Sequence, residues 1–190
     1  MKILMIYPGM VQDLPPVLTS SVMLSELGAS VKIVCAGCAK ETADSLKDHN
    51  VELVQLTLQR YPSSLRGKIF LRLKFRKLLC DALKNCHPDI VWFHGVHAME
   101  YFNSKRLNGF IIVAHAHELY DKFKHVRKQN NVLKNASFFI VPDSNRGWIL
   151  KAQSGSKKPF YVIPNRLPIE VIPAKSKNDE IVLEFFRNGG

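Results

Sequence analysis

Four histidines of this sequence lie in two short stretches, each at the end of a run of apolar residues. His94 and His97 follow the run 90–93, and His115 and His117 end the second run. An imidazole can transfer protons near neutral pH, contact a sugar hydroxyl or coordinate a metal ion. Both runs are typical of buried strands. Open α/β sheets bind ligands beyond the carboxyl ends of their strands, so these histidines predict a functional site there.

The elements that must position these histidines alternate between apolar runs and helical patterns. The expected strands are residues 2–7, 31–35, 51–56, 89–93, 110–114, 138–141 and 160–163. The expected helices cover residues 14–27, 40–49, 64–85, 99–107 and 120–134, with a further helix capped by Ser144. This alternation predicts an α/β fold: a doubly wound, mostly parallel, seven-stranded Rossmann-like sheet with helices on both faces. Right-handed crossovers bring the loops after the strands to one edge, so Gly9, His94 and His117 should converge.

The histidines are expected to differ in role. His117 is the last residue of its strand and precedes Glu118. At this position His117 is expected to be catalytic and Glu118 to bind substrate. His115 lies inside the apolar run and is expected to be structural, whereas His94 and His97 are expected to line a substrate pocket. Metal binding is an alternative, because residues two apart in an extended chain share a face.

The charge of the chain indicates an anionic partner. Twenty-seven Lys and Arg residues outnumber 16 Asp and Glu residues, which gives a net charge of +11. The long helix is especially basic, and Arg66, Lys74, Lys77 and Lys84 are predicted on the side away from the sheet. This pattern predicts contact with an anionic membrane surface, although a solvated basic face is the simpler alternative. No motif for nucleic-acid binding is present, so no such partner is expected.

The remaining sequence signals concern location and domain organisation. The first apolar run, residues 3–7, is too short for a signal peptide or a membrane span, which predicts a cytoplasmic protein. A peripheral position on the inner membrane face is compatible with this prediction. Residues 1–168 are expected to form one domain. Residues 169–190 are expected to be a linker followed by the first strand of a second domain, with a frayed tail as the alternative.

Five segments together resemble the N-terminal domain of GT-B glycosyltransferases of the family 4 type. They are residues 2–9, 88–94, 112–118, 135–144 and 162–165, and the resemblance covers about residues 1–168. In that family the histidine after the fifth strand reaches the donor sugar, which matches His117. The loop after the first strand approaches the diphosphate and matches Pro8 and Gly9. Asn165 matches the family's Ile-Pro-Asn-Gly segment, although Arg166 replaces its glycine.

The resemblance implies the acceptor-binding half of a retaining glycosyltransferase. Such an enzyme moves a sugar from a nucleotide-sugar donor to a polysaccharide or lipid-linked glycan, and this half carries no cofactor and no metal of its own. The family's other half binds most of the donor, so this chain is expected to be inactive alone. Two alternatives stay open: a metal-dependent hydrolase using His94, His97, His115 and His117, and a non-enzymatic module that binds polyanions.

Overall fold

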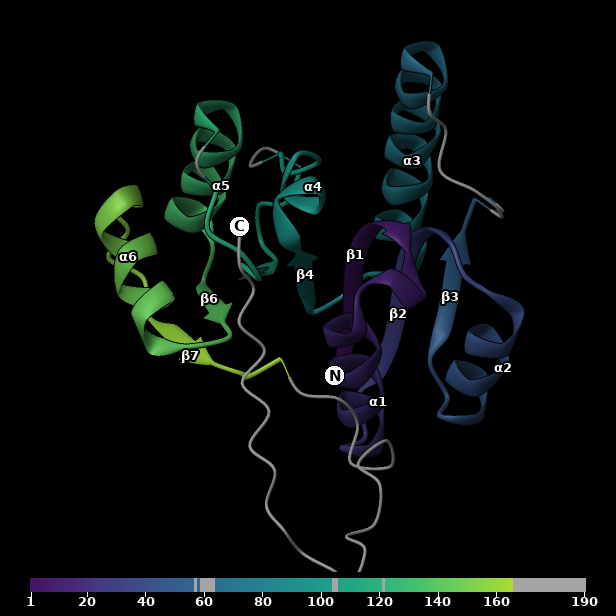
Figure 1. Cartoon of the computed structure of the whole chain (residues 1–190). Coiled ribbons are helices and arrows are strands. Elements are labelled where there is room, and N and C mark those ends of the chain that lie inside the picture. Colours follow the sequence, from purple (N-terminus) through teal and green to yellow (C-terminus); the bar gives the residue numbers. More distant parts are fainter. Residues whose placement is uncertain (57, 59–63, 104–105, 121, 166–190) are drawn as a thin grey trace, which may run out of the picture.

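A seven-stranded, all-parallel sheet forms the centre of the computed structural model (Figure 1), which describes residues 1–56, 58, 64–103, 106–120 and 122–165. The strands are β1 (Lys2–Met10), β2 (Ser30–Gly37), β3 (Glu52–Gln55), β4 (Ile90–His94), β5 (Ile111–His115), β6 (Phe138–Val141) and β7 (Phe160–Val162). Their order across the sheet is β3-β2-β1-β4-β5-β6-β7. The chain therefore starts in the middle of the sheet, builds outward to β3, and then crosses back to build outward in the other direction.

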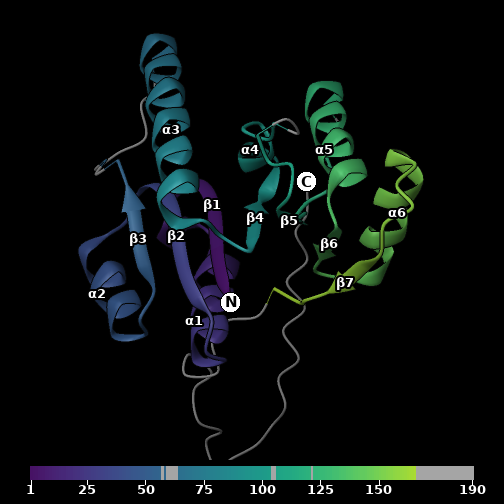
Figure 2. The ribbon, with the colours of Figure 1, turned by 180° about the vertical axis from the view of Figure 1, so that it is seen from behind.

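Helices cover both faces of this sheet. They are α1 (Pro15–Glu26), α2 (Lys40–Asp48), α3 (Leu65–Cys86), α4 (Gly95–Met99), α5 (Phe123–Asn135) and α6 (Ser144–Ser154), with a 3₁₀ turn, η1 (Val11–Asp13). The buried side chains form two clusters, one on each face. Val17 and Leu46 bring α1 and α2 to the first cluster. Phe75, Leu133 and Leu150 bring α3, α5 and α6 to the second cluster, and Figure 2 shows α3 in front of the sheet from that side.

The predicted fold class is confirmed, and six of the seven strands lie within one or two residues of their predicted bounds. The first strand is longer than predicted. Pro8 and Gly9 were expected in a loop after it, but β1 continues to Met10, with an irregularity in its pairing to β2 between Tyr7 and Met10. Pro8 lacks an amide hydrogen, so a break in regular pairing is expected at this residue.

Three helices differ from the prediction, and of these α5 begins at Phe123 instead of residue 120. The fourth helix covers Gly95–Met99 instead of residues 99–107, because Gly95 adopts a φ of +74° and turns the chain into a helix directly after β4. The last helix is capped by Asp143, whose Oδ1 accepts a hydrogen bond of 2.9 Å from the amide of Arg146. The predicted cap, Ser144, is the first residue of that helix.

The long basic helix forms as predicted. The Ser64 side chain caps α3 by accepting a 3.1 Å hydrogen bond from the amide of Gly67. Leu71, Phe75 and Ala82 are buried against the sheet, and the four predicted membrane-facing residues are all exposed. They are Arg66, Lys74, Lys77 and Lys84.

Two further expectations concern the ends and the environment of the chain. The predicted domain boundary at residue 168 and the predicted first strand of a second domain, within residues 169–190, lie outside the described residues. Among the described helices, none combines the length and the apolar character needed to cross a bilayer.

Candidate functional site

His94, His115 and His117 meet at the carboxyl end of the sheet, and we call them the histidine cluster. The register of the parallel pair β4–β5 places His94 directly beside His115. His117 follows two residues after His115 and therefore lies on the same face. The ring centroids are 4.0 Å apart for His115 and His117, 5.0 Å for His94 and His115, and 5.6 Å for His94 and His117.

The histidine cluster is buried. His94 and His115 have no more than 1% of their surface exposed, and His117 has 6%. Burial lowers the pKa of all three imidazoles, to about 4 for His117 and to about 2 for His115. The charge of Arg146 lowers the pKa of His117 further, whereas the nearby Asn165 side chain raises it. All three rings are therefore neutral at pH 7, and each has a nitrogen with a free lone pair.

These pKa shifts predict acid-sensitive stability. Below about pH 6.5 the unfolded chain binds protons at these histidines that the folded chain does not bind. The contribution of the neutral histidines to the free energy of unfolding is fully present above about pH 6.5. It falls as the pH decreases, by about 1.4 kcal/mol per pH unit for each histidine. Urea unfolding between pH 7.5 and pH 5 measures this slope. His117→Gln should reduce it by about one such increment.

A backbone contact fixes the segment that carries His117. The Arg146 guanidinium donates a hydrogen bond from Nη1 to the carbonyl oxygen of His117, and Asp143 holds the same guanidinium at 3.1 Å. The Ala116 amide donates a 2.8 Å hydrogen bond to the carbonyl oxygen of Ile140 in β6. The N-cap Asp143 and Arg146 in the first turn of α6 thus position His117, a role that the sequence did not reveal.

Trp92 is a second neighbour of the histidine cluster that the sequence analysis missed. Its ring lies parallel to His94, with an interplanar angle of 7° and centroids 5.4 Å apart. Residues 92 and 94 alternate with their neighbours along β4, so both side chains lie on one face. The signal was present in the sequence as an aromatic residue two positions before a histidine at a strand end.

His97 is not part of the histidine cluster, although the sequence places it only three residues from His94. It lies on α4, which contacts α5, and its exposed ring is 5.7 Å from that of His125. The hydrolase alternative used all four histidines, and the structure brings only three of them together. Glu118 follows His117 directly in the sequence and is exposed. Asn165 is also exposed, and its side chain lies near the His117 ring.

The structure gives Gly9 a packing role. A Cβ atom at this position would lie 2.7 Å from the Tyr7 ring, so the ring occupies the space that any other side chain would need. Pro8 is buried in β1. Their predicted contact with a diphosphate stays a prediction.

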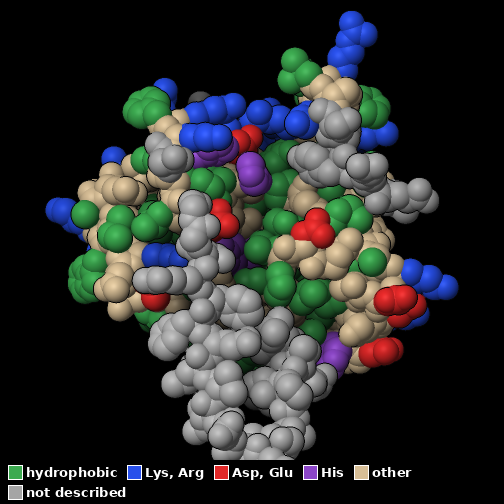
Figure 3. Space-filling view, in the orientation of Figure 1, with side chains coloured by type: hydrophobic (Ala, Val, Ile, Leu, Met, Phe, Trp, Pro, Cys, Tyr) green, Lys and Arg blue, Asp and Glu red, His purple; other side chains and the backbone are tan. Residues whose placement is uncertain are grey.

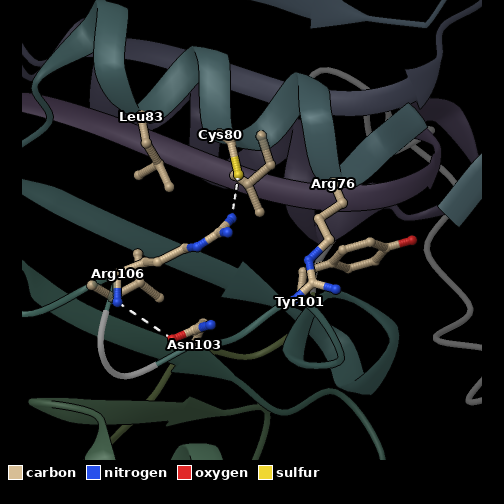
Figure 4. Close-up of a pocket in the computed structure, with 8 residues that line it drawn as sticks. Arg76, Cys80, Leu83, Tyr101, Asn103 and Arg106 are labelled. Atoms are coloured by element: carbon tan, nitrogen blue, oxygen red, sulfur yellow. Dashed lines mark hydrogen bonds between the residues drawn. The ribbon is translucent and has the colours of Figure 1, made fainter. Parts of the chain in front are cut away.

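A separate hollow lies between α3 and the segment that follows α4 (Figure 4). Arg106 crosses it and donates a 2.8 Å hydrogen bond from Nη1 to the Sγ atom of Cys80. Arg76 and Tyr101 also line it. This hollow is on the face opposite the histidine cluster and includes none of the predicted site residues.

Solved structures with a similar fold show which kind of protein shares it. The chain aligns over 90% of its length with 46% of Anabaena Alr3699/HepE, solved with UDP and glucose, at 18% identity and a TM-score of 0.59. It aligns over 86% of its length with 48% of Glycyrrhiza uralensis UGT73P12, at 9% identity and a TM-score of 0.58. A Rickettsia africae glycosyltransferase aligns at 14% identity and a TM-score of 0.57.

Glycosyltransferases share this fold. The chain spans about half the length of these solved relatives. No family model and no curated protein matches the sequence. Because the sequence identities are 18% or lower, the similarity concerns the fold alone.

Proposed function

We propose that this chain is the acceptor-binding, N-terminal half of a retaining GT-B glycosyltransferase of the family 4 type. The observation that carries the proposal is a buried, neutral His117 at the carboxyl edge of a sheet that glycosyltransferases share. This edge is where open α/β sheets bind ligands. The donor would be a nucleotide-sugar, and the acceptor a polysaccharide or lipid-linked glycan.

His117 has properties that suit contact with a donor sugar. A neutral imidazole can donate one hydrogen bond and accept another, which suits a sugar hydroxyl. Arg146 and Asp143 fix the backbone at His117, so its ring is positioned before any substrate arrives. Such preorganised polar groups contribute to catalysis because they need no rearrangement during the reaction. In this proposal, cations from the second half of the enzyme stabilise the leaving diphosphate.

Two measurements test this proposal, one of acceptor binding and one of sugar transfer. Binding of the chain to an array of glycans and lipid-linked oligosaccharides tests the acceptor role. Transfer of radiolabelled sugar from a panel of nucleotide-sugars, by the longest natural protein that contains this chain, tests the reaction. Transfer with retention at the anomeric carbon is the expected result. Absence of both glycan binding and sugar transfer would contradict the proposal.

The exposed surface of α3 supports a membrane-bound acceptor. Its N-terminal half exposes four large apolar side chains together with basic ones, and we call these residues the α3 patch. The apolar members are Leu65, Ile69, Phe70 and Leu73, and the basic members are Arg66, Lys68, Arg72, Lys74, Arg76 and Lys77. Figures 1 and 2 show this half of α3 extending beyond the strand ends, and Figure 3 shows Lys and Arg gathered along the same edge.

This combination suits a helix that lies on an anionic bilayer, with apolar side chains in the interface and cations near the headgroups. The α3 patch and the histidine cluster lie at the same edge of the sheet. In the proposed enzyme, a lipid-linked acceptor would therefore be presented from the membrane toward His117.

Loss of two charges from the α3 patch should weaken membrane binding. Each Lys near an anionic surface contributes about 1 kcal/mol, so Lys74→Gln with Lys77→Gln should lower the affinity about 30-fold. Sedimentation with vesicles containing phosphatidylserine measures this effect, and raised salt should reproduce it. Trp148→Ser, which removes an exposed aromatic residue from α6, is the control and should change little. Equal binding to neutral and anionic vesicles would contradict the role of the patch.

A further inference from the structure

The histidine cluster brings together several buried nitrogen atoms that lack a hydrogen-bond partner. The four ring nitrogens of His94 and His115 have no hydrogen-bond partner among the described residues, and the His117 ring has only the exposed Asn165 side chain nearby. A buried polar atom without a partner costs about 1–3 kcal/mol, and folded proteins leave few of them. Because three such rings lie together, a ligand that binds several nitrogens at once would offset most of this cost.

The spacing of the nitrogens fits a single metal ion. One nitrogen from each ring can be chosen so that all three lie within 4.8 Å of one another. Three nitrogens this close always leave a point that is no more than about 2.8 Å from every one of them, whereas Zn²⁺–N bonds are about 2.0–2.1 Å. The rings therefore need to converge by less than about 1 Å, which small side-chain rotations can supply while β4 and β5 stay in register.

We propose that His94, His115 and His117 bind one first-row transition-metal ion, such as Zn²⁺. Three imidazole ligands leave a fourth tetrahedral position for an exchangeable ligand. This inference goes beyond the proposed function, because sugar transfer as proposed above needs no such ion from this half of the enzyme. With the ion bound, the lone pair of His117 would be taken, and only its ring N–H would remain for a sugar hydroxyl.

The local charges define what the fourth ligand would be. No carboxylate belongs to the group of possible ligands among the described residues, so the ion would keep its full double charge. Arg146, the cation whose charge acts on His117, already pairs with Asp143 at 3.1 Å, which reduces its repulsion of the ion. An anionic oxygen, from hydroxide, a carboxylate or a phosphate, is the class of ligand that balances this charge. His117 is the most exposed of the three histidines, so this ligand would approach from its side.

The rival explanation is an aromatic stack without metal. Trp92 and His94 lie parallel, and the cluster could pack in this way as part of the core. The two explanations differ in a measurable property, because only the metal site predicts stoichiometric, saturable binding that depends on all three histidines.

Metal analysis of the chain decides between them. After dialysis against a chelator, titration with ZnCl₂ by calorimetry should give one site per chain, and Co²⁺ should give the strong visible absorption of a tetrahedral complex. His115→Phe should weaken the affinity by about 100-fold or more, because even loss of an outer-shell partner costs up to this factor. His97→Gln is the matched control, since His97 lies outside the cluster, and should bind as the parent does.

Two further measurements keep the proposal open to contradiction. If His115→Phe does not fold, His117→Cys replaces one ligand with another at the least buried position, and its Co²⁺ complex should gain a thiolate charge-transfer band. Binding that is not stoichiometric, or that His97→Gln abolishes, would overturn the proposal. Neither result depends on sugar transfer, so metal binding and the proposed function can fail separately.

Discussion

His117→Ala should lower the rate of sugar transfer by about 100-fold or more, the scale of losing one preorganised polar group at a reacting centre. Since the ring is proposed to contact the donor sugar, the loss should appear in kcat, with little change in the KM for the acceptor. Steady-state kinetics in the longest natural protein that contains this chain measures both constants. A substituted side chain here also leaves a cavity, so the folded fraction must be measured alongside.

Two controls separate chemistry from packing at this position. His117→Gln keeps a hydrogen-bonding side chain of similar length and should retain more activity than His117→Ala. His49→Gln changes a histidine between α2 and β3, near the opposite ends of the strands, and should leave kcat unchanged. Full activity of His117→Ala would remove His117 from the proposed site, whereas equal loss in both His117 variants would assign the effect to packing.

Phe75→Ala should destabilise the fold by about 3–5 kcal/mol, the usual cost of truncating a buried Phe. The Phe75 side chain is fully buried where α3 packs on the sheet, and its ring lies 4.8 Å from that of Tyr101. A loss of this size is a large fraction of the stability of an ordinary domain. Urea unfolding followed by circular dichroism measures the change.

Phe70 provides a matched control for Phe75 on the same helix. It is 58% exposed, with the Lys74 ammonium 4.4 Å from its ring centroid. Phe70→Ala should change stability by about 0.5 kcal/mol or less, as surface substitutions do, yet it should weaken vesicle binding. If both variants lost the same stability, the exposed position of Phe70 and the assignment of the α3 patch would be wrong.

The strands were predictable from the sequence because each is a short apolar run bounded by polar or turn residues. Residues 138–141, for example, form β6 with the predicted bounds. The short helix after β4 was not predictable, because it depends on the positive φ of Gly95, which the sequence pattern does not encode. Ser144 and Asp143 are both good helix caps, and only the backbone geometry selects Asp143.

The site was predicted in part. The strand-end positions of His94, His115 and His117 followed from the apolar runs, so their convergence on one edge could be expected. The pairing of β4 with β5, which places His94 beside His115, depends on strand order and register. His97 was expected near His94, but a helical turn directs it toward α5 instead. Contacts such as that of Arg146 with the His117 carbonyl join residues 29 apart and left no local signal.

The place of β1 in the sheet affects how the chain is made. β1 lies between β2 and β4, so its second edge is completed only by Ile90–His94. At a synthesis rate of about 5–20 residues per second, β4 follows β1 by roughly 4–16 seconds. Until β4 pairs with it, this edge of β1 has a row of unpaired backbone N–H and C=O groups, which can pair with a strand of another chain. We therefore expect the unfinished chain to be prone to association at the strand that later becomes the centre of its sheet.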